Sequence, residues 1–392
     1  MKILSVVGAR PNFMKISPII SAIDAYNAGS FTLSPSPGRE KIDHFLVHTG
    51  QHYDRIMSES FFQDLGICQP DASLGVGSGT HAGQTAEILR RFEPVLLEER
   101  PDLVLVAGDV NSTLACALVA AKISYGSNGK RPLIAHVEAG LRSFDRTMPE
   151  EVNRVATDHL CDLLFVTEQS GIENLKREGI PEEKIFFVGN TMIDTLMLFR
   201  ERASQSDVLK SLGLIERSNG SERISPYALL TLHRPSNVDN RETFTGILDA
   251  MEKISARLPV VFPAHPRTRK QMDSLQIQNV SRSSGPGAMV TEPLGYIDFL
   301  CLMSNAKLVL TDSGGIQEET TCLGVPCVTI RENTERPVTV TQGTNLLSGV
   351  KPDAIVDAAN RQLARQKGNS APEFWDGRAS YRIVEAIRGR FP

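Results

Sequence analysis

The chain has 392 residues, more than one hydrophobic core normally serves, so we expect two domains of ordinary size. Hydrophobic residues make up 41% and charged residues 22%, as in soluble globular proteins. The 42 basic and 46 acidic residues give a formal charge of −4, which argues against nucleic acid or an anionic membrane as the main partner.

The six cysteines are scattered, with no C-x-x-C pair and no histidine spacing typical of zinc sites. We interpret them as free, mostly buried thiols in a reducing compartment. No signal peptide or stretch long enough to span a bilayer is visible. These features predict a cytoplasmic protein with no cofactor and no metal.

Short, continuously apolar runs recur along the chain, with helical patterns between them. They are 3–7, 45–47, 103–106, 133–136, 163–166, 186–188, 228–232, 260–263, 288–290, 308–310 and 327–330. Strands that are apolar on both faces are typical of parallel sheets covered by helices. The pattern predicts an α/β fold with two Rossmann-like, doubly wound parallel sheets facing a cleft. We place the domain change near Gly189, giving domains 1–189 and 190–370, and interpret 28–41 and 217–226 as polar surface loops.

Charged residues follow several of the predicted strands in the first half. Arg10 and Lys15 lie near a helix start after the first strand, where they could bind an anion or be solvated surface charges. Asp109 follows the strand 103–106 and could be a turn residue or a functional carboxylate. Glu138 ends the next strand, where burial would require a partner such as Arg142.

Glu150 has both a structural and a chemical interpretation. With Thr147 it has the T-x-x-E spacing of a capping box, and Pro149 suits the first turn of a helix. The structural interpretation does not exclude a role for the Glu150 carboxylate in chemistry.

In the second half, the segment Thr311–Glu319 (T-D-S-G-G-I-Q-E-E) predicts a buried strand, a glycine turn and a helix start. Asp312 and Ser313 are suited to cap that helix, whose amide groups would attract phosphate. An ordinary strand–helix turn is the alternative. Histidine–arginine pairs follow two other strands, at His233–Arg234 and His265–Arg267, and favour a diphosphate ligand.

Seven motifs in this order resemble the UDP-N-acetylglucosamine 2-epimerase family across nearly the whole chain. They are G-A-R-P-N-F-M-K at Gly8–Lys15, T-G-Q-H-Y-D at Thr49–Asp54, G-D-V-N-S-T at Gly108–Thr113, H-V-E-A-G-L-R-S at His136–Ser143, P-E-E-V-N-R at Pro149–Arg154, T-D-S-G-G-I-Q-E-E at Thr311–Glu319 and R-E-N-T-E-R-P at Arg331–Pro337. The resemblance implies a GT-B-like fold whose C-terminal helix, within 371–392, crosses back to the first domain.

The resemblance also implies roles for individual residues. The catalytic set would be Asp109, Glu138, Glu150 and His233. The substrate-binding set would be Arg10, Lys15, Phe299, Ser313, Gly314, Gly315, Glu319 and Arg331. Within the second set, the Ser-Gly-Gly loop would hold phosphate and Glu319 would accept ribose hydroxyl groups.

The family implies non-hydrolysing C2 inversion of a UDP-2-acetamido sugar by loss and re-addition of UDP, in a homodimer that supplies polysaccharide biosynthesis. A hydrolysing relative, a silent UDP-sugar-binding protein and a GT-B glycosyltransferase remain alternatives. The short segment Phe144–Met148 resembles branches that include archaeal enzymes and epimerases of UDP-2,3-diacetamido-glucuronate. The substituents at C3 and C6 of the sugar are therefore open.

Overall fold

The computed structural model describes residues 1–31, 40–51, 69–126, 129–218, 220–264, 266–274, 287–365 and 371–391. Contacts divide the chain into two compact units, one of Met1–Thr195 with Glu373–Pro392 and one of Leu196–Pro372. The division falls inside helix α7 (Thr191–Ser204), six residues after the expected change at Gly189. No helix of the described residues is long and apolar enough to cross a membrane.

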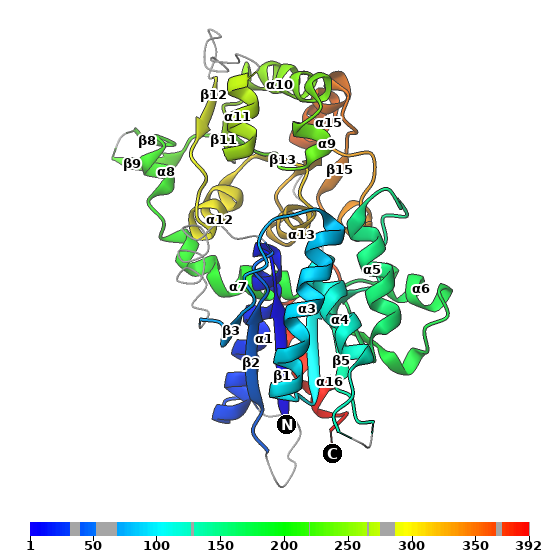
Figure 1. Cartoon of the computed structure of the whole chain (residues 1–392). Helices are drawn as coiled ribbons and strands as arrows, with labels where there is room; N and C mark the ends of the chain where they lie inside the picture. The colour runs from blue at the N-terminus through cyan, green and yellow to red at the C-terminus, as the bar shows by residue number, and fades with distance from the viewer. Residues whose placement is uncertain are drawn as a thin grey trace. The chain divides into compact units, whose positions relative to one another are not determined.

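The first unit is built on a seven-stranded parallel sheet with the order β3-β2-β1-β4-β5-β6-β7 (Figure 1). Its strands are β1 (Lys2–Val7), β2 (Asp43–His48), β3 (Ala72–Ser73), β4 (Leu103–Ala107), β5 (Leu133–Ala139), β6 (Leu163–Val166) and β7 (Ile185–Phe187). Its helices are α1 (Arg10–Ala28), α3 (His81–Glu99), α4 (Asn111–Lys122), α5 (Pro149–Leu160), α6 (Gln169–Arg177), the short 3-10 helix Glu182–Lys184, and α16 (Ala379–Arg388).

Helices cover this sheet because its central strand, β4, is apolar throughout. Every residue of β4 is buried, and Ile88, Phe92 and Leu96 on α3 are fully buried at helical spacing. In Figure 1, α3, α4 and α5 lie together over one face of the sheet.

The C-terminal segment is fixed to the first unit by α16. Both carboxylate oxygens of Asp194 accept the first amide groups of α16, from Ala379 at 3.0 Å and Ser380 at 2.6 Å. The buried Trp375 donates its indole N–H to the Thr167 carbonyl, and α16 packs against α1. The last residues are therefore structural parts of the first unit.

The second unit repeats the same design with a six-stranded parallel sheet of order β12-β11-β10-β13-β14-β15. Its strands are β10 (Ala228–Thr231), β11 (Val260–Pro263), β12 (Ala288–Thr291), β13 (Leu308–Thr311), β14 (Cys327–Thr329) and β15 (Asn345–Leu347). Its helices are α8 (Val208–Ser211), α9 (Pro235–Val238), α10 (Arg241–Ser255), α11 (Pro266–Ser274), α12 (Tyr296–Asn305), α13 (Gly314–Leu323), α14 (Val338–Thr341) and α15 (Pro352–Ala364).

The prediction of a loop at 217–226 is wrong. An antiparallel pair, β8 (Ile215–Ser218) and β9 (Ser221–Ile224), occupies most of it. The other expected loop, 28–41, lies mostly outside the described residues.

Both sheets have a point at which the strand order reverses, between β1 and β4 in the first unit and between β10 and β13 in the second. Adjacent loops at the carboxyl ends of these strands diverge, and parallel α/β sheets bind their ligands there. The loops that follow β1, β4 and β13 carry three of the seven motifs singled out from the sequence, and the loop after β10 carries His233 and Arg234.

Candidate active site

The glycine turn of the second unit starts a helix that no side chain caps. β13 ends at Thr311, and Ser313 is the N-cap of α13, but it makes no side-chain cap hydrogen bond. The expected capping by Asp312 and Ser313 is therefore wrong. A Cβ atom on Gly314 would lie 2.5 Å from Nη1 of Arg336, so a side chain here would displace that guanidinium, which pairs with Glu318 and Glu335. The first amide groups of α13 remain suited to bind an anion.

Asp312 joins this turn to the loop after β10 instead of capping α13. Its carboxylate accepts the backbone amides of His233 and Arg234 and lies 2.9 Å from Nδ1 of His233. Burial alone raises the pKa of Asp312, but the bonds from His233 and the two amides outweigh it and lower that pKa. The half-exposed His233 ring is thus held through Nδ1 beside the reversal point of the sheet.

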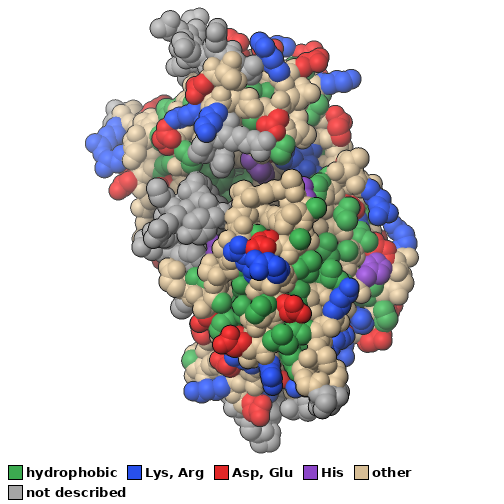
Figure 2. Space-filling model, viewed as in Figure 1, with side chains coloured by type: hydrophobic (Ala, Val, Ile, Leu, Met, Phe, Trp, Pro, Cys, Tyr) green, Lys and Arg blue, Asp and Glu red, His purple; other side chains and the backbone are tan. Residues whose placement is uncertain are grey.

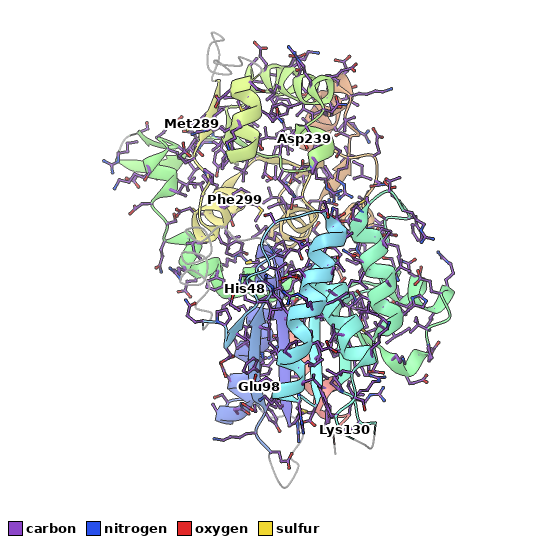
Figure 3. All side chains as sticks on the ribbon, in the orientation of Figure 1. His48, Glu98, Lys130, Asp239, Met289 and Phe299 are labelled. Atoms are coloured by element: carbon purple, nitrogen blue, oxygen red, sulfur yellow. The ribbon has the colours of Figure 1, made fainter. Side chains whose placement is uncertain are left out.

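Glu319 lies one turn further along α13 and is buried against Tyr296 of α12. The Tyr296 hydroxyl donates to Oε1 of Glu319 at 2.8 Å. Burial raises the pKa of Glu319 to about 7, against the opposing effect of that bond, and nearby Glu318 adds to the rise. Phe299, three residues after Tyr296, lies half-buried on α12 (Figure 3).

Arg331 follows β14, and its guanidinium is buried with one nitrogen that donates to no described residue. Its Nη2 donates to Glu335 at 2.7 Å, whereas the buried Nη1 has no hydrogen-bond partner among the described residues. A buried guanidinium nitrogen without an acceptor is costly. An anionic ligand at this position would remove that cost.

In the first unit, Asp109 follows β4 and is held by an arginine of α5. Arg154 donates to Oδ2 of Asp109 from Nε at 3.1 Å and from Nη2 at 2.7 Å, and it also pairs with Glu151. Glu151 in turn accepts the amides of Ser143 and Phe144. The arginine therefore fixes the carboxylate of Asp109 relative to the start of α5.

Glu138, the residue before the last of β5, has a backbone conformation that is unusual for glutamate. Its φ is +74°, at the position where the pairing of β5 with β6 shifts register. A non-glycine residue in this region costs about 1–2 kcal/mol, and such strain clusters at functional sites. The buried carboxylate pairs with the buried ammonium of Lys15, whereas Arg142, the expected partner, pairs with Asp158 and Glu178.

Glu150 lies in the first turn of α5 and is half-buried. The predicted capping box is wrong, because Met148 is the N-cap and Thr147 donates its hydroxyl to Asp145 instead. Sequence reasoning missed the pairing of Glu151 with Arg154, although the P-E-E-V-N-R motif contains both. Their helical spacing of three was the available signal.

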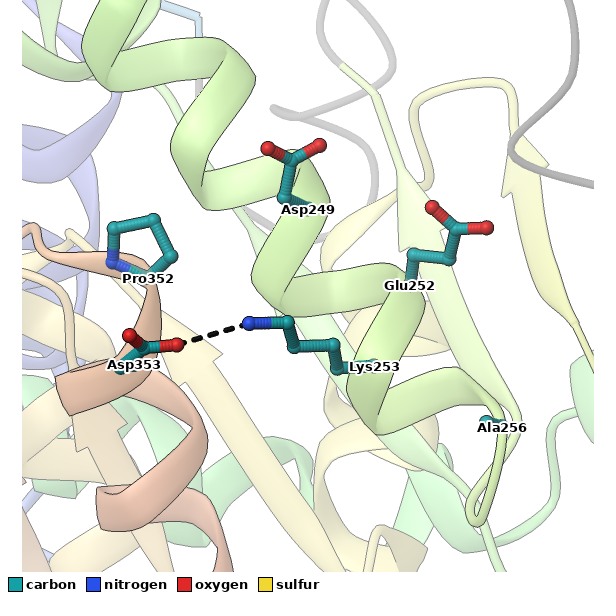
Figure 4. A pocket seen from close by; sticks show the side chains of 6 residues that line it. All are labelled: Asp249, Glu252, Lys253, Ala256, Pro352 and Asp353. Carbon is teal, nitrogen blue, oxygen red and sulfur yellow. Dashed lines mark hydrogen bonds and ion pairs between the residues drawn. The ribbon is translucent and has the colours of Figure 1, made fainter.

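Other predicted residues cannot be placed, because the side chain of Arg10, the residues His52–Asp54 and His265, and the side chain of Arg267 lie outside the described part. The hollow in Figure 4 includes no predicted site residue, and its lysine, Lys253, pairs with Asp353 at 2.9 Å. Within the described ranges, no group of three or more His, Cys, Asp or Glu side chains is arranged to hold a metal ion.

Comparison with known proteins decides the family. The model of the UDP-N-acetylglucosamine 2-epimerase family matches residues 37–388. This chain belongs to that family. A UDP-N-acetylglucosamine 2-epimerase of Methanocaldococcus jannaschii is 41% identical over 389 residues, 99% of both chains. A UDP-2,3-diacetamido-2,3-dideoxy-D-glucuronate 2-epimerase of Pseudomonas aeruginosa is 40% identical over 99% of both chains.

Solved structures of the UDP-N-acetylglucosamine 2-epimerase family support the same assignment. The Methanocaldococcus jannaschii enzyme in complex with UDP-GlcNAc and UDP has a TM-score of 0.85 at 40% identity, covering 99% of this chain and 100% of that one. A galactosyltransferase of the lipopolysaccharide outer core, 14% identical with a TM-score of 0.54, shares only the fold. The predicted family and the GT-B-like, two-sheet α/β fold are both confirmed.

Proposed function

We propose that this chain is a non-hydrolysing 2-epimerase that interconverts UDP-N-acetylglucosamine and UDP-N-acetylmannosamine. The observation that carries the proposal is the full-length, 41% identical relative of that name, together with two carboxylates paired with cations, Asp109 after β4 and the buried Glu138 in β5. Binding alone needs few carboxylates beside a diphosphate, so these groups favour an enzyme over a silent binding protein.

The second unit carries the groups assigned to UDP. The uncapped amides at Ser313–Gly315, at the start of α13, would bind a phosphate group, and the spare Nη1 of Arg331 offers a second donor for an anion. Glu319, deprotonated when bound, would accept ribose hydroxyls in place of the Tyr296 hydroxyl. His233, held through Nδ1, would stand near the diphosphate, and Phe299 and Arg10 complete the proposed binding set.

The first unit carries the groups assigned to the sugar. The C2 proton is not acidic in the substrate, so inversion begins with breakage of the C1–O bond and departure of UDP through an oxocarbenium-like state. Loss of the C2 proton then leaves a 2-acetamidoglucal. UDP adds back to C1 as a proton returns to the opposite face of C2. Asp109, Glu138 and Glu150 share the proton work and stabilise the cationic sugar.

Lys15 has a more specific place in this scheme than diphosphate binding alone. Its buried ammonium faces the Glu138 carboxylate. A Cβ atom on Gly108 would lie 2.9 Å from the Lys15 ammonium nitrogen. In this position the Lys15 ammonium holds the Glu138 carboxylate in place, where it would accept a proton from the sugar. Arg154 holds the carboxylate of Asp109 in the same way.

The reaction is tested by incubating the purified protein with UDP-N-acetylglucosamine and following the products by proton NMR. Signals of UDP-N-acetylmannosamine at a stable equilibrium ratio are expected. Free N-acetylmannosamine with stoichiometric UDP would instead identify a hydrolysing enzyme. No change in any UDP-2-acetamido sugar would contradict the proposal.

A second substrate is favoured by one specific observation, the Pseudomonas aeruginosa relative that is named for UDP-2,3-diacetamido-2,3-dideoxy-D-glucuronate. It is nearly as similar to this chain as the archaeal enzyme, whereas the Escherichia coli UDP-N-acetylglucosamine 2-epimerase is 33% identical. Including the diacetamido-glucuronate in the NMR panel separates the two substrates by their relative rates.

We further place the enzyme in the cytoplasm as a homodimer that supplies polysaccharide biosynthesis. Support for the dimer comes from the face of α3, α4 and α5, where hydrophobic side chains gather at the surface (Figure 2). Exposed members of this face include Leu97 and Val152, both 44% exposed. Val152→Glu should shift the protein toward monomer in light scattering, whereas Leu363→Glu, at a similarly exposed site on α15, should not.

A further inference from the structure

His136 is a fully buried histidine of β5 with oxygen acceptors at both ring nitrogens. Its Nδ1 lies 2.7 Å from Oδ1 of Asp158, and its Nε2 lies 2.8 Å from the carbonyl oxygen of Gly108. A carbonyl oxygen can only accept a hydrogen bond. Burial raises the pKa of Asp158, but His136 and Arg142 outweigh it and lower that pKa, so the carboxylate accepts as well. Both ring nitrogens are therefore placed to donate to an oxygen acceptor.

Through Nε2, the ring of His136 holds the peptide group that leads into Asp109. Gly108 has a φ of +67°, and its own amide donates to the Val137 carbonyl at 3.0 Å. The Gly108 carbonyl and the Asp109 amide belong to one planar peptide group. Fixing that carbonyl therefore fixes the direction in which Asp109 leaves the end of β4.

Through Nδ1, the same ring is tied to the segment that follows Glu138. Asp158 accepts the amide of Gly140 at 3.1 Å with its second oxygen, which also lies 2.7 Å from Nη2 of Arg142. Glu178 balances the charge of Arg142. Glu138 thus lies between two fixed points, its strand neighbour His136 and the peptide of Gly140.

The strained conformation of Glu138 makes these fixed points necessary. A left-handed φ in glutamate persists only where the surroundings over-determine it. Lys15 holds the Glu138 side chain, but the backbone on either side is held by the hydrogen bonds of His136 and Asp158.

We propose that His136 is a positioning residue for the epimerase reaction: its doubly protonated ring, bridging Asp158 and Gly108, sets Asp109 and Glu138 in their working arrangement. The proposal rests on the proposed function, and it assigns His136 no contact with substrate. An error of about 1 Å in such an arrangement can cost 100-fold in rate.

Two variants separate the two hydrogen bonds of His136, because each variant can keep only one of them. In His136→Asn the side-chain amide can reach the position of Nδ1 and keep the bond to Asp158, while the bond to Gly108 is lost. In His136→Gln the amide can reach the position of Nε2 and keep the bond to Gly108. We expect kcat to fall about 100-fold in His136→Asn with little change in KM, and His136→Gln to recover most of the loss. The exposed His159 of α5 provides the control His159→Asn, with unchanged kinetics.

A measurement without substrate keeps this inference separate from the proposed function. In the 15N-labelled wild-type protein, the NMR signals of the His136 ring, assigned by their loss in His136→Gln, should show a proton on both nitrogens at neutral pH. A ring with one unprotonated nitrogen would overturn the inference, as would wild-type kcat in His136→Asn or equal losses in both variants. A wild type inactive on every UDP-2-acetamido sugar would overturn the proposed function while leaving the ring-proton result intact.

Discussion

Two carboxylates of the first unit, Asp109 and Glu138, are held by cations. Asp109 pairs with Arg154, and Glu138 pairs with Lys15. A carboxylate fixed in place can act as a proton acceptor, and its removal should slow the chemistry more than it weakens UDP binding. UDP binding is assigned to groups of the other unit.

We therefore expect Asp109→Asn and Glu138→Gln to bind UDP normally in calorimetry but to lose at least about 100-fold in kcat. Glu93→Gln, an exposed carboxylate of α3, is the matched control and should be fully active. Full activity in both carboxamide variants would remove these residues from the mechanism.

The raised pKa of Glu319 predicts a pH dependence of stability. Its folded-state pKa is about 7 against an ordinary value of 4.5, so between these values the folded state binds more protons than the unfolded state. The free energy of unfolding should therefore fall as pH rises through this window, by roughly 3 kcal/mol in total. Urea unfolding at pH 5 and pH 7.5 should show this loss in wild type but not in Glu319→Gln. Identical pH slopes in the two proteins would contradict it.

For single residues, the sequence predicts candidate site residues more readily than it predicts the side chains with which they pair. Asp109, Glu138 and His233 were found because each follows an apolar strand. The pairing of Lys15 with Glu138 joins residues 123 positions apart, and the choice of Arg142 as partner of Glu138 was wrong for that reason. The expected capping box of Glu150 is absent, and the buried Glu151 instead accepts the amide of Ser143. This contact likewise depends on how α5 packs against the loop after β5.

Among the helices and strands, the start of α13 has the features that most directly indicate phosphate binding. Its N-cap residue, Ser313, makes no side-chain cap hydrogen bond, and a side chain at Gly314 would displace the guanidinium of Arg336. A bulky side chain at Gly315 would project from the same turn and obstruct an approaching phosphate. We expect Gly315→Val to abolish measurable UDP binding, with Gly315→Ala intermediate and both variants folded. Unchanged UDP affinity in a folded Gly315→Val protein would refute this placement.

The periodicity of the sequence predicted the sheets well because their strands are buried on both faces. All eleven apolar runs fall on strands of the two parallel sheets, including the short β7 and β14. β8 and β9 were missed because Ile215–Ser218 and Ser221–Ile224 are exposed and polar, so their pairing leaves no hydrophobic signal. The two-residue β3 is too short to produce a pattern.

For the whole molecule, repetition of one strand order explains why two distinct groups of residues emerge. Each unit gathers polar side chains at its own reversal point, carboxylates with cations in the first and an anion-binding helix start in the second. This division of labour fits a reaction in which a leaving diphosphate and a sugar carbon need different partners. The family resemblance predicted one function for each unit, sugar chemistry in the first and UDP binding in the second. The length and the apolar runs alone predicted only two α/β domains.

The central claim is that the C2 proton leaves and returns through side chains that exchange with water. Epimerisation in deuterium oxide, followed by proton NMR and mass spectrometry, tests it directly. The epimeric product should carry deuterium at C2 from the first turnover, and recovered substrate should gain it as the reaction reverses. Epimer formed with hydrogen retained at C2 would contradict the account.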